Sequence, residues 1–150
     1  MKTTLRLVLF AVLVGPLSLT VYAGDQGLDL INYMRSLQYF AHKTHLSLEA
    51  GNRDLASFYA HEIDEVIEAL EQVESYDEQP IGQLAKAILV PPDEAFESAM
   101  RHESLEVAAV RFAELIQACN ACHKAARHGV ISIQMSSANP YMQSFAPVAQ

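Results

Sequence analysis

Apolar residues spaced three and four positions apart recur along most of this chain, and this spacing constrains its fold more than any other feature of the sequence. Residues at that spacing lie on one face of a helix, where they form an apolar stripe. The pattern predicts four amphipathic helices, at residues 28–50, 52–73, 80–102 and 104–128. Residue types that favour helix ends stand at the boundaries, namely Gly51, Asn52, Pro80 and Ser104.

Two consecutive prolines, Pro91 and Pro92, interrupt the third helical segment. Proline has no N–H to donate and its ring clashes with the preceding turn, so we expect this helix to be kinked or split there and to resume at Asp93. Gly129 follows the last segment, and residues 130–150 carry turn residues without helical spacing. The sequence therefore predicts an all-α fold: an antiparallel up-down-up-down four-helix bundle with an irregular C-terminal tail folded on it.

The first residues have the pattern of a secretory signal peptide, residues 1–23. Lys2 and Arg6 form a basic start, an apolar stretch follows, and small residues lead to a cleavage site after Ala23. The apolar stretch is short and broken by glycine and proline, whereas a membrane-spanning helix needs about 20 apolar residues. We therefore expect an exported, periplasmic protein with a bundle domain at residues 24–129 and no membrane span after cleavage.

The charge balance of the mature chain excludes one large class of partners. Of the chain's 10 basic side chains, Lys2 and Arg6 lie in the signal peptide, which leaves 8 against 18 acidic side chains and a formal charge of −10. Nucleic-acid binding relies on Lys and Arg that neutralise phosphates, so a nucleic-acid partner is not expected. No basic run indicates a membrane surface either.

The chain's two cysteines stand in the motif "CNACH", with a histidine directly after the second cysteine. On a helical wheel at about 100° per residue, Cys119, Cys122 and His123 continue the apolar stripe of the last helix. The three side chains are therefore expected to face the interior of the bundle, near the C-terminal end of that helix.

Four chemistries use a pair of cysteines at this spacing. A zinc site needs three or four protein ligands, and the sequence has no second Cys/His pair at zinc-finger spacing. A thioredoxin-type dithiol opens a helix that follows a strand. A disulfide between residues three apart in a helix is geometrically unfavourable and closes almost no loop. Attachment of one haem c agrees with every observation, because Cys119 and Cys122 can bond the two vinyl groups while His123 ligates the iron from the same face.

The chain also resembles a known family. A CxxCH motif near the end of the last helix of an exported bundle is similar to cytochrome c′, and Arg127 matches the basic residue that commonly follows the haem-binding histidine there. The segments "LQYFAHK", "LASFYAHEIDEVIE", "ACNACHKA" and "ANPYMQSFAP" resemble a group of small exported bundle cytochromes over nearly the whole mature chain. The resemblance implies a mono-haem c-type cytochrome with Arg127 at the haem pocket. The proline pair and the tail depart from cytochrome c′ itself.

The residue opposite His123 decides whether the iron is open to further ligands. In an up-down-up-down bundle the end of the last helix lies beside the start of the first. Met34 is therefore the candidate distal ligand or cap, with simple core packing as the alternative. The other candidate pocket residues are Leu37, Gln38, Phe112 and Ile116.

Glu62 lies within the apolar stripe of the second helix and faces His42 across the first hairpin. A buried carboxylate needs a partner, so these residues are predicted to form a hydrogen-bonded pair. A sharper alternative is a non-haem metal site that combines "HEIDE", residues 61–65, with His42 and His45, although the last two helices offer no Glu-x-x-His. The remaining acidic residues of the second helix are expected on a solvated face: Asp64, Glu65, Glu68 and Glu71.

Three functions are weighed for such a haem domain. The first is electron transfer with a redox partner protein and no substrate turnover, so that the protein is not an enzyme. The second is a five-coordinate haem protein that binds a small gas such as nitric oxide or carbon monoxide. An enzyme needs a polar distal group for acid–base catalysis, and near Met34 the stripe offers only Gln38. Because bundle cytochromes often dimerise, a homodimer through the first hairpin is a further hypothesis.

Overall fold

The computed structural model describes residues 26–148, so the predicted signal peptide at residues 1–23 lies outside the described range. Within that range the chain forms five helices and no β-strand, which confirms the all-α class. The helices are α1 (Gln26–Glu49), α2 (Arg53–Leu70), α3 (Ile81–Ile88), α4 (Val90–His102) and α5 (Leu105–Ala125). None of these described helices combines the length and the apolarity that crossing a membrane requires.

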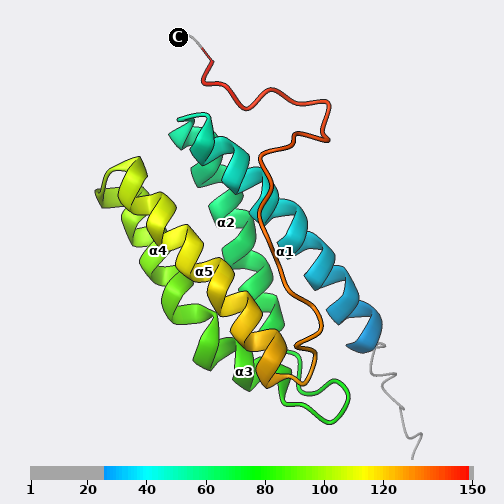
Figure 1. Ribbon diagram of the computed structural model, residues 1–150. Helices are drawn as coiled ribbons and strands as arrows, with labels where there is room; N and C mark the ends of the chain where they lie inside the picture. Colours follow the sequence, from blue (N-terminus) through cyan, green and yellow to red (C-terminus); the bar gives the residue numbers. More distant parts are fainter. Residues whose placement is uncertain (1–25, 149–150) are drawn as a thin grey trace, which may run out of the picture.

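α1 and α2 form a helical hairpin joined by a short turn (Figure 1). Gly51 has φ +70°, a left-handed conformation that glycine adopts without steric cost. Asn52 then caps α2, because its side-chain oxygen accepts a hydrogen bond from the N–H of Leu55 at 3.1 Å. The helix-end residues read from the sequence therefore act at this turn as predicted.

The connection from α2 to α3 depends on a close backbone approach at Gly82. The Gly82 N–H donates to the carbonyl of Val73 at 2.8 Å, which holds the first turn of α3 against the chain after α2. A Cβ at position 82 would collide with the carbonyl oxygen of Glu71. Only glycine fits here, and the backbone contact fixes where α3 begins.

The third predicted helix is divided into α3 and α4 at Leu89, ahead of the proline pair. Pro91 and Pro92 lie in the first turn of α4, where backbone N–H groups have no acceptor within the helix and the missing donor costs nothing. Backbone bonds continue through the junction, from the Leu89 N–H to Ala85 O at 2.8 Å and from the Asp93 N–H to Leu89 O at 3.1 Å.

The hydrophobic core joins α2, α4 and α5. Phe96 is fully buried, and its ring lies 5.2 Å from that of Phe112, centroid to centroid. Leu70 and Leu115 are equally inaccessible to water. Burying one such side chain contributes about 1.5–3 kcal/mol, so this layer supplies much of the stabilisation that fixes α5 in place.

The last helix ends earlier than the sequence predicts. α5 stops at Ala125, three residues before His128, and Gly129 is not its cap. Arg127 adopts the left-handed conformation instead, with φ +62°, and the His128 N–H donates back to the carbonyl of His123 at 2.7 Å. This bond closes a Schellman-type end, in which a non-glycine residue carries the strained angle.

Candidate functional site

The CNACH motif occupies the last two turns of α5. The helix begins at Ser104, whose hydroxyl accepts a hydrogen bond from the Val107 N–H at 3.3 Å. Cys119 and Cys122 are both free thiols and half-buried, one helical turn apart, and both pack against the main hydrophobic core. The two thiols are therefore present on one inward-facing side of the helix, as the periodicity predicts.

Both thiols are held in their neutral form. Burial raises the pKa of Cys119 to about 12, with further contributions from the neighbouring Cys122 and from Asp93. Burial also raises the pKa of Cys122. A redox dithiol needs a lowered pKa to generate its thiolate, so this environment opposes a thioredoxin-like activity.

His123 is held in the tautomer of a metal ligand. Its Nδ1 lies 3.3 Å from the carbonyl oxygen of Ile131. A carbonyl only accepts hydrogen bonds, so Nδ1 must carry the proton and the lone pair lies on Nε2. Burial, with a smaller contribution from the charge of His128, lowers the pKa of His123 and keeps the ring neutral. Histidines that bind metals commonly donate their second ring N–H to a carbonyl in this way.

The tail crosses α5 directly beside the motif. Asn120, the residue after the first cysteine, makes two hydrogen bonds to the backbone of Ile133. It accepts from the Ile133 N–H at 2.6 Å and donates to the Ile133 carbonyl at 3.0 Å. The tail then runs between α5 and α1 (Figure 1), and Ile133 and Met135 pack against the same core as the two cysteines.

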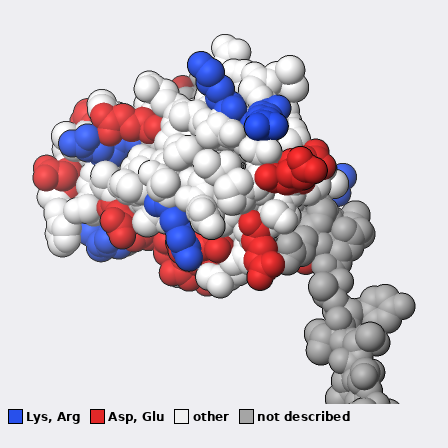
Figure 2. Space-filling model, turned by 90° about the horizontal axis from the view of Figure 1, so that it is seen from below, with Lys and Arg blue, Asp and Glu red and all other residues white. Residues whose placement is uncertain are grey.

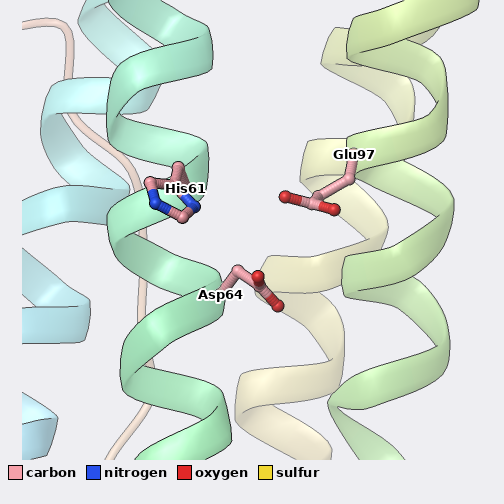
Figure 3. A group of neighbouring side chains, drawn as sticks. All are labelled: His61, Asp64 and Glu97. Atoms are coloured by element: carbon pink, nitrogen blue, oxygen red, sulfur yellow. The ribbon is translucent and has the colours of Figure 1, made fainter.

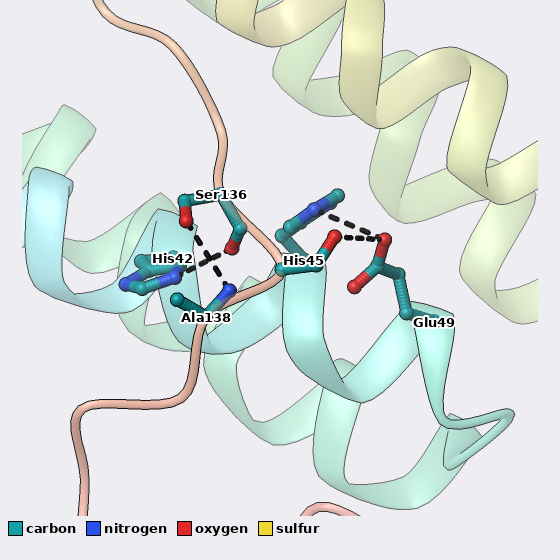
Figure 4. A network of polar contacts seen from close by, with 6 residues as sticks. His42, His45, Glu49, Ser136 and Ala138 are labelled. Atoms are coloured by element: carbon teal, nitrogen blue, oxygen red, sulfur yellow. Dashed lines mark hydrogen bonds and ion pairs between the residues drawn. The ribbon is translucent and has the colours of Figure 1, made fainter.

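Farther along, the tail is bonded to α1 (Figure 4). His42 Nε2 donates to the Ser136 carbonyl at 2.7 Å, and His42 Nδ1 accepts from the Tyr141 hydroxyl at 3.0 Å. The Ser137 hydroxyl donates to Glu49 at 2.8 Å, and the same carboxylate lies 3.4 Å from His45. These contacts extend over two turns of α1, so the tail is docked along its length.

A buried lysine fixes the last described part of the tail. Lys43 donates to the Gln143 side chain at 2.7 Å and lies over the rings of Tyr39, Tyr59 and Tyr141, 4.4–5.2 Å from their centroids. Burial lowers the pKa of Lys43, but its contacts with Tyr39 and Tyr59 raise it by more, and the net shift is upward. The ammonium therefore stays charged, and the aromatic faces stabilise it.

The predicted pair between His42 and Glu62 does not form. Both ring nitrogens of His42 are bonded to the tail, while Glu62 is half-buried on α2. The tail after α5 reaches α1 and supplies better-placed partners for the imidazole, namely the carbonyl of Ser136 and the hydroxyl of Tyr141.

The predicted pocket residues fall into two environments. Met34 and Leu37 are half-buried and pack against the core, and Phe112 and Ile116 are buried within it. Gln38 is exposed and lines a groove of about 500 Å³ between α1 and residues 132–136 of the tail. Arg127 is also exposed, at the strained end of α5.

A second group of ligand-type side chains lies between α2 and α4 (Figure 3). His61 and Asp64 project from α2 and Glu97 from α4, and one ligand atom of each lies within 4.8 Å of the others. Asp64, expected on a solvated face, is half-buried. The metal-site alternative joined residues 61–65 to α1, whereas the structure joins them to α4. The sequence gives no single motif for this group: His61 and Asp64 stand three residues apart, and only the packing of α2 against α4 brings Glu97 beside them.

Comparisons with known proteins identify no relative. No protein-family model matches the chain, no curated protein matches it, and no solved structure matches it.

Proposed function

We propose that this protein is an exported c-type cytochrome that carries one covalently bound haem and transfers electrons in the periplasm. Cys119 and Cys122 would attach the haem, and His123 would ligate its iron through Nε2. In this proposal the domain is an up-down-up-down four-helix bundle, in which α3 and α4 together form the third helix.

One observation carries the proposal: the bond from His123 Nδ1 to the carbonyl of Ile131. It leaves the Nε2 lone pair for a metal, directly beside two free thiols on the same helix. The motif also lacks the features of a redox dithiol, the alternative that needs a reactive thiolate. Its thiol pKa values are raised rather than lowered, and it lies at the C-terminal end of a helix, where the helix dipole does not favour a thiolate.

The residues around the motif suit a buried, relatively apolar cofactor. A haem supplies a reversible ferrous/ferric couple, and burial of its surroundings tunes the reduction potential. Asn120 holds the tail in place beside the motif, and Ile133 and Met135 pack against the same core as the two cysteines. Met34 packs on the same core from α1 and would be the candidate for a second protein ligand or a cap if haem is bound.

The surface at this end of the molecule suits a transient protein partner. Figure 2 views the end of the bundle where α5 terminates: acidic and basic side chains lie around a largely uncharged centre. Protein interfaces are depleted of charge at their centre and polar at their rim. A redox partner protein that docks here would approach the end of the bundle that carries the motif.

The test is an absorption spectrum of the protein from a host that matures c-type haem, reduced with dithionite, with and without carbon monoxide. We expect a haem spectrum that survives denaturation, because the thioether bonds are covalent. Narrow bands that ignore carbon monoxide indicate a filled sixth position and electron transfer, and Met34→Ala should then open that position. Bands that shift with the gas favour the gas-binding alternative. Absence of retained haem would refute both.

A further inference from the structure

Two neighbouring helices, α2 and α4, present a histidine and two carboxylates to a common point, and none of the three belongs to the CNACH motif. His61 and Asp64 are three residues apart on α2, and Glu97 faces them from α4 (Figure 3). Side chains three residues apart lie on the same face of a helix, so the α2 pair forms one side of the group and Glu97 the other. No turn or loop contributes, so the positions of all three are set by helix packing.

The spacing of the three groups approaches that of ligands around one metal ion. Their ligand atoms lie within 4.8 Å of one another. For bonds of about 2.0–2.2 Å, two ligand atoms on opposite sides of one ion are about 4.4 Å apart. Small side-chain rotations therefore bring all three to bonding distance.

A fourth carboxyl group lies behind this set and supplies the independent observation. Asp93, one turn before Glu97 on α4, is only 2% exposed, and its Oδ1 has no hydrogen-bond partner within the described residues. Its carboxyl lies against that of Asp64. The carboxylate of Glu97 also lies near that of Asp93. A buried acidic group with an unpartnered oxygen, beside two more carboxylates, is the environment that a cation stabilises.

The contacts of the nearby side chains leave most of this group unpaired. Arg101 bonds Glu97 Oε2 at 2.9 Å, one turn along the exposed side of α4, and therefore engages one of the two carboxylate oxygens. His61 lies 3.5 Å from Glu65, a distance longer than a hydrogen bond. Neither contact neutralises Asp64 or Asp93.

We propose that His61, Asp64 and Glu97 form a binding site for a divalent first-row metal ion, with Asp93 as the buried carboxyl group that adjoins it. One imidazole with two or three carboxylates suits ions that accept both nitrogen and oxygen ligands, such as Mn²⁺, Fe²⁺ or Zn²⁺. The bound ion joins α2 to α4 and offsets the repulsion among the carboxylates. None of its three ligands belongs to the CNACH motif, although Asp93 lies near both groups.

The experiment is a titration of the protein with Mn²⁺, followed by the loss of the electron paramagnetic resonance signal of the free aqueous ion. Mn²⁺ is the probe because it favours oxygen ligands, whereas Zn²⁺ would also bind thiolates of any chain without haem. The protein is isolated from a host that matures c-type haem and is first treated with a chelator. We expect one ion per chain, and at least about 10-fold weaker binding in His61→Ala and in Glu97→Gln.

The chain offers a matched control for each variant. His45 lies beside Glu49 at 3.4 Å as His61 lies beside Glu65, and Glu114 is bonded to Arg111 at 2.8 Å as Glu97 is to Arg101. His45→Ala and Glu114→Gln should bind Mn²⁺ as the parent does. Equal affinity in the parent and in His61→Ala, or no saturable binding, overturns the proposal. The haem absorbance of the same samples reports the haem site separately, so the two proposals can fail independently.

Discussion

The molecule holds two groups of side chains suited to metals, and they are built in opposite ways. Cys119, Cys122 and His123 lie within five consecutive residues of α5, so the helical repeat alone brings them to one side. His61 and Glu97 are far apart in the sequence and meet only because α2 packs beside α4 (Figure 3). A local group is readable as a motif, whereas a group assembled by packing has no consecutive sequence signature.

The two groups also differ in charge. The motif is neutral: burial keeps the thiols protonated and the His123 ring uncharged. The group between α2 and α4 concentrates negative charge around the buried Asp93. Under the proposed function, replacing the two cysteines of the motif should abolish covalent haem attachment. Changes in the group between α2 and α4 should instead alter the free energy of unfolding and its dependence on pH.

The largest expected effect is at the motif. Cys119→Ala combined with Cys122→Ala should retain no haem after denaturation and acidic extraction, because no thiol remains to form a bond. His61→Ala, which alters the other group, should keep its full haem content. Haem retained by the double cysteine variant at the parent level would show that attachment does not use these thiols.

Asp93→Asn should raise stability in chelator-containing buffer, and the gain should grow with pH. The pKa of Asp93 is about 8 in the folded protein against 3.8 as its reference. Between these values the unfolded chain has lost a proton that the folded protein keeps, so stability falls as the pH rises. At pH 7.5 the penalty removed by asparagine is on the order of 5 kcal/mol at most.

Urea denaturation at pH 4 and pH 7.5 measures this difference. Parent and variant should be close at pH 4, because the unfolded chain has there lost only part of the Asp93 proton that the folded protein keeps. The exposed Glu74, which is not among the main charges that act on Asp93, gives the control, since Glu74→Gln should shift neither curve appreciably. A constant difference between parent and Asp93→Asn across this pH range would contradict the raised pKa.

Asn120→Ala should loosen the tail where it passes the motif. The variant loses both bonds to Ile133, and we expect a loss of about 2 kcal/mol in the free energy of unfolding. Asn139 is a matched control, because its two bonds, to Tyr141 and Gln143, stay within the tail. Faster proteolytic cleavage near residue 133 in Asn120→Ala, compared with Asn139→Ala, would show that the tail is anchored at the motif.

The smallest expected effect is at the end of α5. Arg127 has φ +62°, so Arg127→Gly should relieve the strain and raise the free energy of unfolding by about 0.5–1 kcal/mol. Arg127→Ala keeps a Cβ and should not share the gain. A role of Arg127 at the haem pocket predicts that Arg127→Gly also alters the haem spectrum. A purely conformational role predicts an unchanged spectrum.

Sequence periodicity predicted the helices well and their ends less well. The first two helices begin and end within a few residues of their predicted bounds, because Gly51 and Asn52 act locally. The break in the third helix falls at Leu89 instead of the prolines, since a first turn tolerates proline. The last helix ends before Gly129, because a backbone bond to His123 closes it at Arg127.

The sequence by itself determined the all-α class and the position of the thiols and imidazole on one helix face, since both follow from a repeat of about 3.6 residues. Tertiary structure alone decided what these groups meet. The carbonyl of Ile131 sets the tautomer of His123. His42 bonds the tail instead of Glu62. The packing of α2 against α4 brings His61, Asp64 and Glu97 together. Such contacts depend on how elements distant in the chain pack together, which no local pattern encodes.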